Sequence, residues 1–329
     1  MILVTGGTGL VGAHLLLNLI EKGETVRAIY RNPERILKTK SLFSLYKKEA
    51  LYESIQWIQA DILDIPSLES AFKDIEQVYH CAAFISFDPK EEDIVRKTNI
   101  EGTANIVNFC LTNNIKKLCH VSSIAALGDL AEHETIITEE TEWNPEKPHS
   151  DYAISKYGAE MEIWRGQQEG LQVVIVNPGV IIGPGFWEQG SGALFTKVKK
   201  GLPFYTIGST GFVAVTDVVE TAYKLMKSTI HGERFTLINQ NIVFRDMLFT
   251  IADALNVKRP KYHANPTIMN ILWKLDWIAS AFLGQSSQIS KATAKSSYSN
   301  DLYSNEKIKN ALNLSFIDVH HYIKEIVKL

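Results

Sequence analysis

The sequence predicts a doubly wound α/β fold, in which helices cover both faces of a parallel sheet. Three observations support this prediction. Apolar runs that suit strands buried on both faces alternate with segments of helical periodicity over residues 1–177. The first run leads through closely spaced glycines into a helix. Beyond residue 178 the alternation stops, and we expect a smaller, mostly helical second lobe.

The expected elements follow from apolar periodicity and from the turn residues between apolar runs. Strand character is found in residues 2–4, 25–30, 55–60, 77–83, 117–123, 171–176 and 234–238. Helical character is found in residues 10–20, 34–54 (which could be broken), 66–72, 93–112, 151–169, 193–200, 218–227, 244–255, 266–283, 304–312 and 319–327. Residues 128–149 and 179–192 are expected to be loops, and Thr216-Asp217 to cap the helix at 218–227.

The change of pattern divides the chain into two parts. We expect residues 1–177 to form a dinucleotide-binding domain, to which residues 212–240 return. Residues 178–211 and 241–329 are expected to form the substrate-binding lobe. Lys274 and Asp276 interrupt the apolar segment 266–283, which therefore predicts an amphipathic helix and no membrane span.

Charge and cysteine content exclude several classes of protein. The chain has 34 Lys and Arg against 37 Asp and Glu, and no basic cluster with interleaved aromatic residues, so we expect no nucleic-acid partner. Cys81, Cys110 and Cys119 lack C-x-x-C spacing and suit a reduced core. The irregular acidic residues of 128–149 favour a solvated loop over a metal site. With the glycine turn already at residue 6, no leader is expected, which favours a cytoplasmic protein.

The first strand and helix are joined by a turn with the spacing G-x-x-G-x-x-G. We expect Gly6 to permit the tight turn, Gly9 to leave space for a pyrophosphate, and Gly12 to let the helix approach the strand. The helix N-terminus would present free N–H groups to the phosphates. The predicted cofactor contacts of this turn are Thr5, Gly6, Gly9, Leu10, Val11 and Gly12.

The residues after the second and third strands bear on which dinucleotide binds. An acidic residue at the end of the second strand would bind the ribose of NAD, but Arg31 stands there. Because a guanidinium suits a 2′-phosphate, we favour NADP and leave NAD open. Asp61 and Ile62 follow the third strand and are expected to contact adenine. The alternative is that Asp61 caps the next helix.

The fourth strand ends in small residues followed by aromatic ones. The backbone of Ala82 and Ala83 could approach the cofactor closely. Phe84 and Phe87 lie at the carboxyl end of the strand, where ligands bind in open α/β sheets, and are expected to line a substrate pocket. His80 lies within the strand, so we expect a hydrogen-bonded core histidine and no catalytic base.

Ser123, Tyr152 and Lys156 form the candidate catalytic group. Tyr152 and Lys156 are four residues apart on a predicted helix and project from one face. A neighbouring ammonium and an oxidised nicotinamide would lower the pKa of the tyrosine from about 10. Tyr152 could then give a proton to, or take one from, a substrate oxygen that Ser123 orients. Lys156 would also hold the nicotinamide ribose.

These motifs resemble those of the extended short-chain dehydrogenases/reductases, the NAD(P)-dependent epimerase/dehydratase superfamily. The matching segments are TGGTGLVG at 5–12, HCAA at 80–83, TNIEGT at 98–103, VSSIAALG at 121–128, YAISK at 152–156, NPGVIIGPG at 177–185, FVAVTDVV at 212–219 and YSNEKIKNAL at 303–312. The RNPER segment after the second strand is similar to dihydroflavonol-reductase-like members, which favour NADPH.

The resemblance implies a Rossmann-type fold and particular roles for several residues. Ser123, Tyr152 and Lys156 would be catalytic, although the neighbouring Ser122 could take the place of Ser123. Asn99, Pro178 and Val180 would contact the cofactor. The family often forms homodimers through the helices at 92–112 and 151–168, so a homodimer is expected here.

Three functions are weighed at this stage. The first is an NADP-dependent reductase or dehydrogenase of a small to medium, fairly apolar carbonyl or alcohol, with Ile182, Phe186 and Trp187 as further pocket walls. The second is a nucleotide-sugar epimerase or dehydratase with tightly bound NAD. No arginine lies between Arg165 and Arg234 to clamp a sugar diphosphate, which argues against it. The third, a non-catalytic cofactor sensor, would have no need of the proton-transfer pair.

Overall fold

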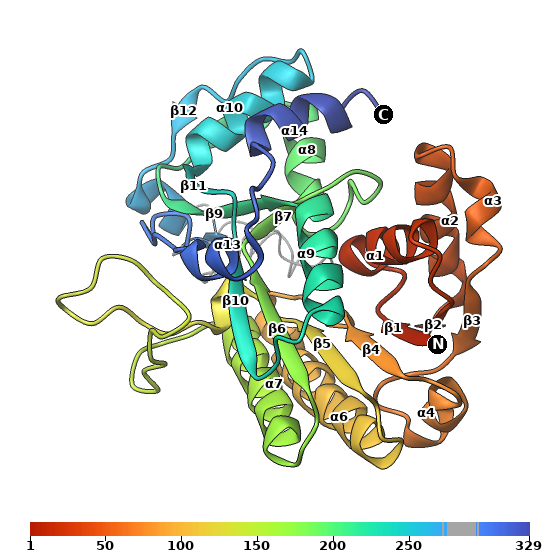
Figure 1. The fold of residues 1–329 in the computed structure, drawn as a ribbon. Helices are drawn as coiled ribbons and strands as arrows, with labels where there is room; N and C mark the ends of the chain where they lie inside the picture. Colours follow the sequence, from red (N-terminus) through yellow and green to blue (C-terminus); the bar gives the residue numbers. More distant parts are fainter. Residues whose placement is uncertain (272, 275–293, 295) are drawn as a thin grey trace.

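A seven-stranded parallel sheet forms the centre of the molecule (Figure 1). The computed structural model describes residues 1–271, 273–274, 294 and 296–329. The strands are β1 (Ile2–Thr5), β2 (Val26–Tyr30), β3 (Gln56–Gln59), β4 (Gln77–His80), β5 (Lys117–Val121), β6 (Val173–Pro178) and β10 (Glu233–Leu237). Their spatial order is β10-β6-β5-β4-β1-β2-β3, and every neighbouring pair is parallel. The predicted doubly wound fold is therefore confirmed.

Helices cover both faces of the sheet because successive strand residues point to opposite sides. Val4 belongs to the core cluster under α1 (Leu10–Glu21) and α9 (Val215–Lys227). Leu3 belongs to a second cluster under α4 (Ile65–Phe72), α6 (Gly102–Thr112) and α7 (Asp151–Gln168). Neither side chain has any exposed surface. These two apolar layers hold the strand ends, and thus the site, in fixed positions.

Two predicted helices are interrupted in the structure. The segment 34–54 forms α2 (Ile36–Leu45) and α3 (Glu49–Tyr52), separated by Lys47 with a positive φ of 57°. The segment 93–112 begins as α5 (Glu92–Arg96), continues as a π-helical turn at Lys97–Glu101 and becomes α6. Wide π turns inside helices often occur at functional sites. This one contains Asn99, which is 2% exposed.

The second lobe contains short strands that the sequence analysis did not predict. The expected loop 179–192 includes β7 (Val180–Ile182), which pairs with β9 (Ser209–Ala214); β9 also pairs with β11 (Gln240–Val243). Because a three-residue strand has too few positions to show alternation, its sequence gave no signal. The lobe also contains β8 (Phe204–Tyr205), β12 (Tyr262–His263), α8 (Gly192–Lys199), α10 (Phe244–Ala254), α13 (Glu306–Leu312) and α14 (Val319–Ile326).

Two further expectations concern this part of the chain. The predicted cap at Thr216-Asp217 is wrong, because α9 begins at Val215 and Ala214 precedes it. The Asp217 carboxylate accepts instead from the amide of Ile317 at 2.8 Å, which ties the C-terminal segment to α9. Most of the predicted helix 266–283 lies outside the described residues. Within the part of the chain that the structure describes, no helix is long and apolar enough to cross a bilayer.

Candidate functional site

The candidate site lies where the strand order reverses, between β1 and β4. The chain leaves β1 toward β2 on one side and reaches β4 and β5 on the other, which opens a crevice at the carboxyl ends of the strands. Gly6 follows β1 with a φ of +70°, and a Cβ there would lie 2.6 Å from the amide nitrogen of Ala82. The turns after β1 and β4 therefore meet, and Gly6 is required for their contact.

The glycine turn fits a dinucleotide phosphate. A Cβ at Gly12 would lie 2.2 Å from the carbonyl oxygen of Gly6, so only glycine allows α1 to approach the turn this closely. A Cβ at Gly9 would meet only one protein atom within 4 Å, the Gly6 oxygen at 3.5 Å. Gly9 precedes α1 without a side-chain cap, and the first turn of α1 has no acidic residue. The first amides of α1 are thus available to an anion at an open position.

Arg31 and Asp61 meet at the ends of β2 and β3. Arg31 Nη1 lies 3.7 Å from Asp61 Oδ2, and half of the Arg31 side chain is exposed. Asp61 Oδ1 also accepts from the amide of Leu63 at 3.0 Å. The alternative that Asp61 caps the next helix is not found, because Asp64 is the residue that precedes α4. Ile62 is buried and packs against Gly102. A Cβ on Gly102 would lie 2.5 Å from Ile62 Cδ1, so there is no space there for a larger residue.

Asn99 joins the loop after β4 to α7. Its Oδ1 accepts from the amide of Phe84 at 2.7 Å, and its Nδ2 donates to the carbonyl of Phe84 and to Ser155 Oγ, both at 2.9 Å. The π turn directs this buried amide between the two elements. Asn99 thus fixes the position of Phe84 relative to α7. Of the two residues before Phe84, Ala82 is partly buried and Ala83 is exposed.

His80 is a hydrogen-bonded core residue, as the sequence analysis expected. Its Nδ1 is 2.7 Å from Thr5 Oγ1 and its Nε2 is 2.9 Å from Thr103 Oγ1. Burial lowers its pKa to about 3, with the charge of Lys156 adding to the effect. The ring of His120 lies 5.2 Å from that of His80. Within the described structure neither nitrogen of His120 has a hydrogen-bond partner.

Ser123, Tyr152 and Lys156 come together at the carboxyl end of β5. The Lys156 ammonium donates to the carbonyl oxygen of Val121 at 3.0 Å. Burial lowers its pKa to about 8, while the charge of Glu160 acts in the opposite direction. Burial raises the pKa of Tyr152, and hydrogen bonding with Ser123 opposes this rise. The expected lowering of the tyrosine pKa is therefore not found in this chain alone, because desolvation outweighs the other influences.

The structure also separates Ser123 from Ser122. Ser122 is 4% exposed and faces the interior, where it interacts with Glu160. Ser123 is partly exposed, lies beside Tyr152, and its Oγ accepts from the amide of Ala125 at 3.1 Å. Both serines follow the last residue of β5, and of the two only Ser123 has substantial exposed surface. The geometry favours Ser123.

A buried polar network behind these residues was missed by the sequence analysis. Asn177 Nδ2 donates to the carbonyl of Ser123 at 3.0 Å and to Glu160 Oε1 at 2.5 Å. Arg234, from β10, lies 3.2 Å from Glu160 Oε2 and donates to the carbonyl of Glu139. The carboxylate of Glu139 accepts from the amide of Thr236 at 2.6 Å. The expectation that the acidic loop 128–149 is solvated is thus wrong for Glu139, which is 5% exposed.

The position of Glu160 in the sequence could have indicated that it belongs to this network. It lies four residues after Lys156, on the same face of α7. Burial raises the pKa of Glu160, whereas Ser122, Arg234 and Asn177 oppose this rise. A carboxylate at this spacing behind a buried lysine predicts a polar network beneath the site, although its arginine partner could not be identified from local spacing.

The candidate pocket residues fall into two groups. The ring of Phe87, 42% exposed, lies 5.6 Å from the ring of Tyr152, and Phe84 is partly exposed. Ile182 has no exposed surface, and Phe186 packs with Ala13 and Leu42. Trp187 packs on Phe195, with their rings 5.0 Å apart. Phe87 thus lies beside Tyr152, whereas Ile182, Phe186 and Trp187 mainly pack into the core.

Pro178 and Val180 lie at the junction of the two sheets. Pro178 is the last residue of β6 and pairs with Leu237, and the following amide of Gly179 donates to the carbonyl of Leu237 at 3.0 Å. Val180 is partly exposed and pairs with Phe212. The main chain is thus held at the rim of the crevice by two strands.

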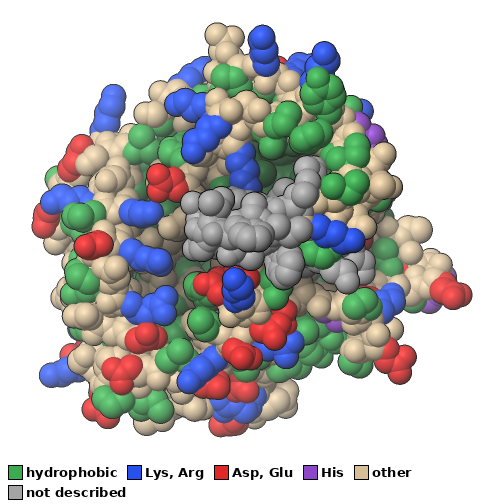
Figure 2. Space-filling view, turned by 180° about the vertical axis from the view of Figure 1, so that it is seen from behind, with side chains coloured by type: hydrophobic (Ala, Val, Ile, Leu, Met, Phe, Trp, Pro, Cys, Tyr) green, Lys and Arg blue, Asp and Glu red, His purple; other side chains and the backbone are tan. Residues whose placement is uncertain are grey.

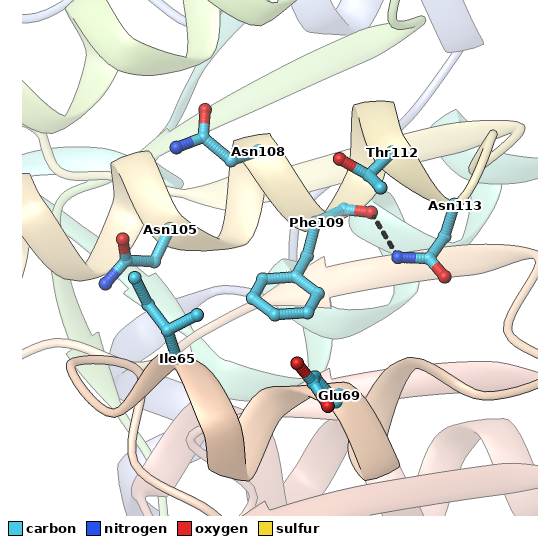
Figure 3. Close-up of a pocket in the computed structure, with 7 residues that line it drawn as sticks. All are labelled: Ile65, Glu69, Asn105, Asn108, Phe109, Thr112 and Asn113. Carbon is cyan, nitrogen blue, oxygen red and sulfur yellow. Dashed lines mark hydrogen bonds between the residues drawn. The ribbon is translucent and has the colours of Figure 1, made fainter.

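Two pockets occur away from these residues. One, of about 440 Å³, lies between α4 and α6, where Asn105 and Phe109 point toward Ile65 and Glu69 (Figure 3). The other, of about 650 Å³, borders Glu139, Trp143, Tyr157 and Arg234. Ser123, Tyr152 and Lys156 are not among the residues that line either pocket.

The model of the NAD dependent epimerase/dehydratase family matches residues 2–238. The chain belongs to this family, and the resemblance noted in the sequence is confirmed. It is an NAD(P)-dependent enzyme of oxidoreductase type.

Two curated proteins and one solved structure are similar to this chain. Sterol demethylase protein B of Methylococcus capsulatus is 27% identical over 274 residues, which cover 81% of this chain and 78% of that protein. Dihydroflavonol 4-reductase of Solanum lycopersicum is 26% identical over 271 residues, 79% of this chain and 69% of that protein. UDP-glucose 4-epimerase of Thermus thermophilus, solved in complex with NAD, superposes with a TM-score of 0.74 at 21% identity, covering 99% of this chain and 97% of that one.

Proposed function

We propose that the protein is an NADP-dependent oxidoreductase that transfers a hydride between nicotinamide and a carbonyl or alcohol of a fairly apolar substrate. The observation that carries this proposal is the meeting of Ser123, Tyr152 and Lys156 at the strand ends, beside the open glycine turn. A proton donor next to a dinucleotide site is what carbonyl reduction needs. Similarity to reductases supports the same conclusion.

Each side chain has a distinct task. The amides at the start of α1 bind the pyrophosphate, and the Lys156 ammonium binds the nicotinamide ribose. Ser123 donates a hydrogen bond to the substrate oxygen and orients it toward Tyr152. Tyr152 gives its proton to that oxygen during reduction and takes it back during oxidation. When bound, the cofactor supplies or accepts the hydride.

The preference for NADP rests on Arg31. Its guanidinium is half exposed at the end of β2, and the only carboxylate paired with it among the described residues is Asp61, at a long 3.7 Å. Such a weak, partly exposed pair yields readily to a phosphate, which can accept two hydrogen bonds from one guanidinium. The backbone of Ala82, Ala83, Pro178 and Val180 would complete the cofactor site, with Asn99 positioning it.

Substrate chemistry follows from the residues beside Tyr152. Phe84 and Phe87 present aromatic surface to the crevice, which favours an apolar substrate over a charged one. The second lobe, residues 178–211 and 241–329, supplies the remaining walls. The site is less suited to bind a nucleotide sugar. Arg234 pairs with Glu160 and donates to the carbonyl of Glu139, so it is not free to bind a diphosphate.

The cofactor released by denaturing the purified protein separates these functions. An epimerase that regenerates its cofactor in each turnover retains it, so stoichiometric NAD would overturn the reductase proposal. A protein that releases none and binds NADPH more tightly than NADH supports it. Oxidation of NADPH with a panel of apolar aldehydes and ketones then identifies the substrate.

We also propose that the protein is a cytoplasmic homodimer. Ile94 on α5 and Met161 on α7 are 53% and 39% exposed, and they lie on the helices through which related enzymes are expected to pair. Cys81, Cys110 and Cys119 are free thiols, which suits a reducing compartment. Light scattering of the purified protein measures the mass, and a single-chain mass would exclude the dimer.

A further inference from the structure

Two short segments of the second lobe come together at one surface. β8 and β12 pair in parallel, with Phe204 beside Tyr262 and Tyr205 beside His263. The amides of Lys261 and Tyr262 both donate to the carbonyl of Pro203, at 3.0 and 2.9 Å. We call this surface, residues 197–205 and 258–263, the basic aromatic face.

The basic aromatic face carries a concentration of positive charge. Its two segments contain no acidic residue, in a chain whose net charge is −3. The cations are Lys197, Lys199, Lys200, Lys258, Arg259 and Lys261. Arg259 pairs with Asp253 at 2.6 Å, whereas no ion pair among the described residues involves the five lysines. Lys197 and Lys199 lie in the last turn of α8, where the helix dipole stabilises positive charge. Lys258 and Lys261 lie outside that helix, so the dipole does not explain why cations occur at their positions.

Exposed aromatic side chains lie among these cations. Tyr262 is 54% exposed, its ring lies 6.0 Å from that of Phe204, and Lys261 Nζ lies 5.7 Å from its centre. In Figure 2 Lys and Arg side chains are spread over the face shown, and those on its upper part have hydrophobic side chains and few Asp or Glu side chains beside them. Lysines with an adjoining exposed tyrosine are typical of protein surfaces that lie at the headgroup level of a bilayer.

We propose that the basic aromatic face binds the anionic headgroups of a phospholipid surface. The five unpaired lysines complement headgroup phosphates and carboxylates, and the ring of Tyr262 enters the interfacial layer. The expectation that the chain has no basic cluster with aromatic residues is wrong here, because residues 258–263 already place three cations beside Tyr262. The other half of the face, residues 197–205, joins them only through β8 and β12. An apolar substrate partitions into a bilayer, so binding of the basic aromatic face to the bilayer would bring the second lobe close to its substrate. This connection between membrane binding and substrate rests on the proposed function.

The test is sedimentation of the full-length protein with lipid vesicles. One set is phosphatidylcholine alone, and the other contains about a third phosphatidylserine, each at about 0.1 M and about 0.5 M salt. The charge-reversed variant K199E/K200E/K261E is compared with K73E/K90E/K328E, which makes the same change of net charge at exposed lysines outside the face. Unchanged thermal unfolding and NADPH binding show that both variants are folded.

The expected result is binding to anionic vesicles at low salt, weakened at least about tenfold by K199E/K200E/K261E and little by the control triple variant. Tyr262→Ser is expected to weaken binding severalfold without changing its salt dependence. Absence of binding by the wild-type protein, equal loss in both triple variants, or equal binding to phosphatidylcholine alone would each overturn the proposal. Preferential binding of an oligonucleotide with the same dependence on the face would overturn it in favour of nucleic acid. None of these outcomes depends on the reductase activity.

Discussion

Glu160 and Arg234 form an ion pair that joins α7 to β10, the edge strand of the sheet. Arg234 Nη1 lies 3.2 Å from Glu160 Oε2, and Glu160 has no exposed surface. Removing one partner leaves the other charge buried, which costs about 3–5 kcal/mol. We expect Arg234→Met to lower the free energy of unfolding in urea by roughly that amount. The double variant Glu160→Leu/Arg234→Met should recover part of the loss, and a double variant less stable than Arg234→Met would contradict this.

Gly9 and Gly12 allow binding and folding to be tested separately. A Cβ at Gly12 would lie 2.2 Å from backbone, so Gly12→Ala should destabilise the fold by about 2 kcal/mol or more. A Cβ at Gly9 is 3.5 Å from its nearest protein neighbour, so Gly9→Ala should change stability by no more than about 0.5 kcal/mol. We nevertheless expect Gly9→Ala to weaken NADPH binding at least about tenfold, because the methyl group occupies phosphate space. Calorimetry measures the affinity, and unchanged binding would place the phosphate elsewhere.

Arg31 should discriminate between the two dinucleotides. Losing a guanidinium–phosphate interaction costs about 1.5–3 kcal/mol, so Arg31→Ala should weaken NADPH binding about 10- to 150-fold. NADH binding should change little. Arg35→Ala, a few residues further along the same exposed turn, is the matched control and should have a smaller effect. If Arg31→Ala weakens both cofactors equally, the side chain does not bind the 2′-phosphate.

Tyr152 should be required for turnover but not for cofactor binding. Once a substrate is found, Tyr152→Phe is expected to lower kcat at least about 100-fold, because the proton donor is lost. The control is Tyr157→Phe in the same helix, whose ring stacks on Trp143 at 4.4 Å. Its kcat should stay close to that of the wild type. Turnover by Tyr152→Phe at the wild-type rate would assign the proton to another group.

His120 should make the fold sensitive to acid. Burial lowers its pKa well below 6.5, and the nearby charges of His80 and Lys156 lower it further. Below pH 6.5 the unfolded chain therefore binds a proton that the folded chain does not, and stability falls by up to about 1.4 kcal/mol per pH unit from this group. His120→Leu should remove that part of the slope and add about 1–2 kcal/mol at neutral pH, because an unpartnered buried imidazole is lost. Urea unfolding at several pH values measures the slope, with exposed His133→Gln as the control.

Much of the fold was predictable because its signals are local. The buried strands of the sheet read as short apolar runs, and Gly6 and Gly12 stand where turn geometry requires glycine. Tyr152 and Lys156 were predictable for the same reason, since four residues of helix place them on one face. Each of these features is specified within a few residues of the chain.

What could not be predicted depends on partners distant in sequence. Glu139 is buried because Arg234 and Thr236, about a hundred residues later, satisfy its carbonyl and carboxylate. β7 exists because β9 lies beside it, not because of its own three residues. The position of Ile182 and Phe186 in the core likewise follows from how the second lobe closes on α1 and α2.

The place of β10 at the edge of the sheet has a consequence during synthesis. β6 ends at Pro178, but its neighbour β10 begins only at Glu233, after α8, β9 and α9 have been made. Until then the backbone groups of β6 on that side are unpaired, and such an exposed edge can pair with another chain. The nascent protein is therefore prone to aggregate over this interval, and we expect a polypeptide stopped between the two strands to bind chaperones more than the complete chain does.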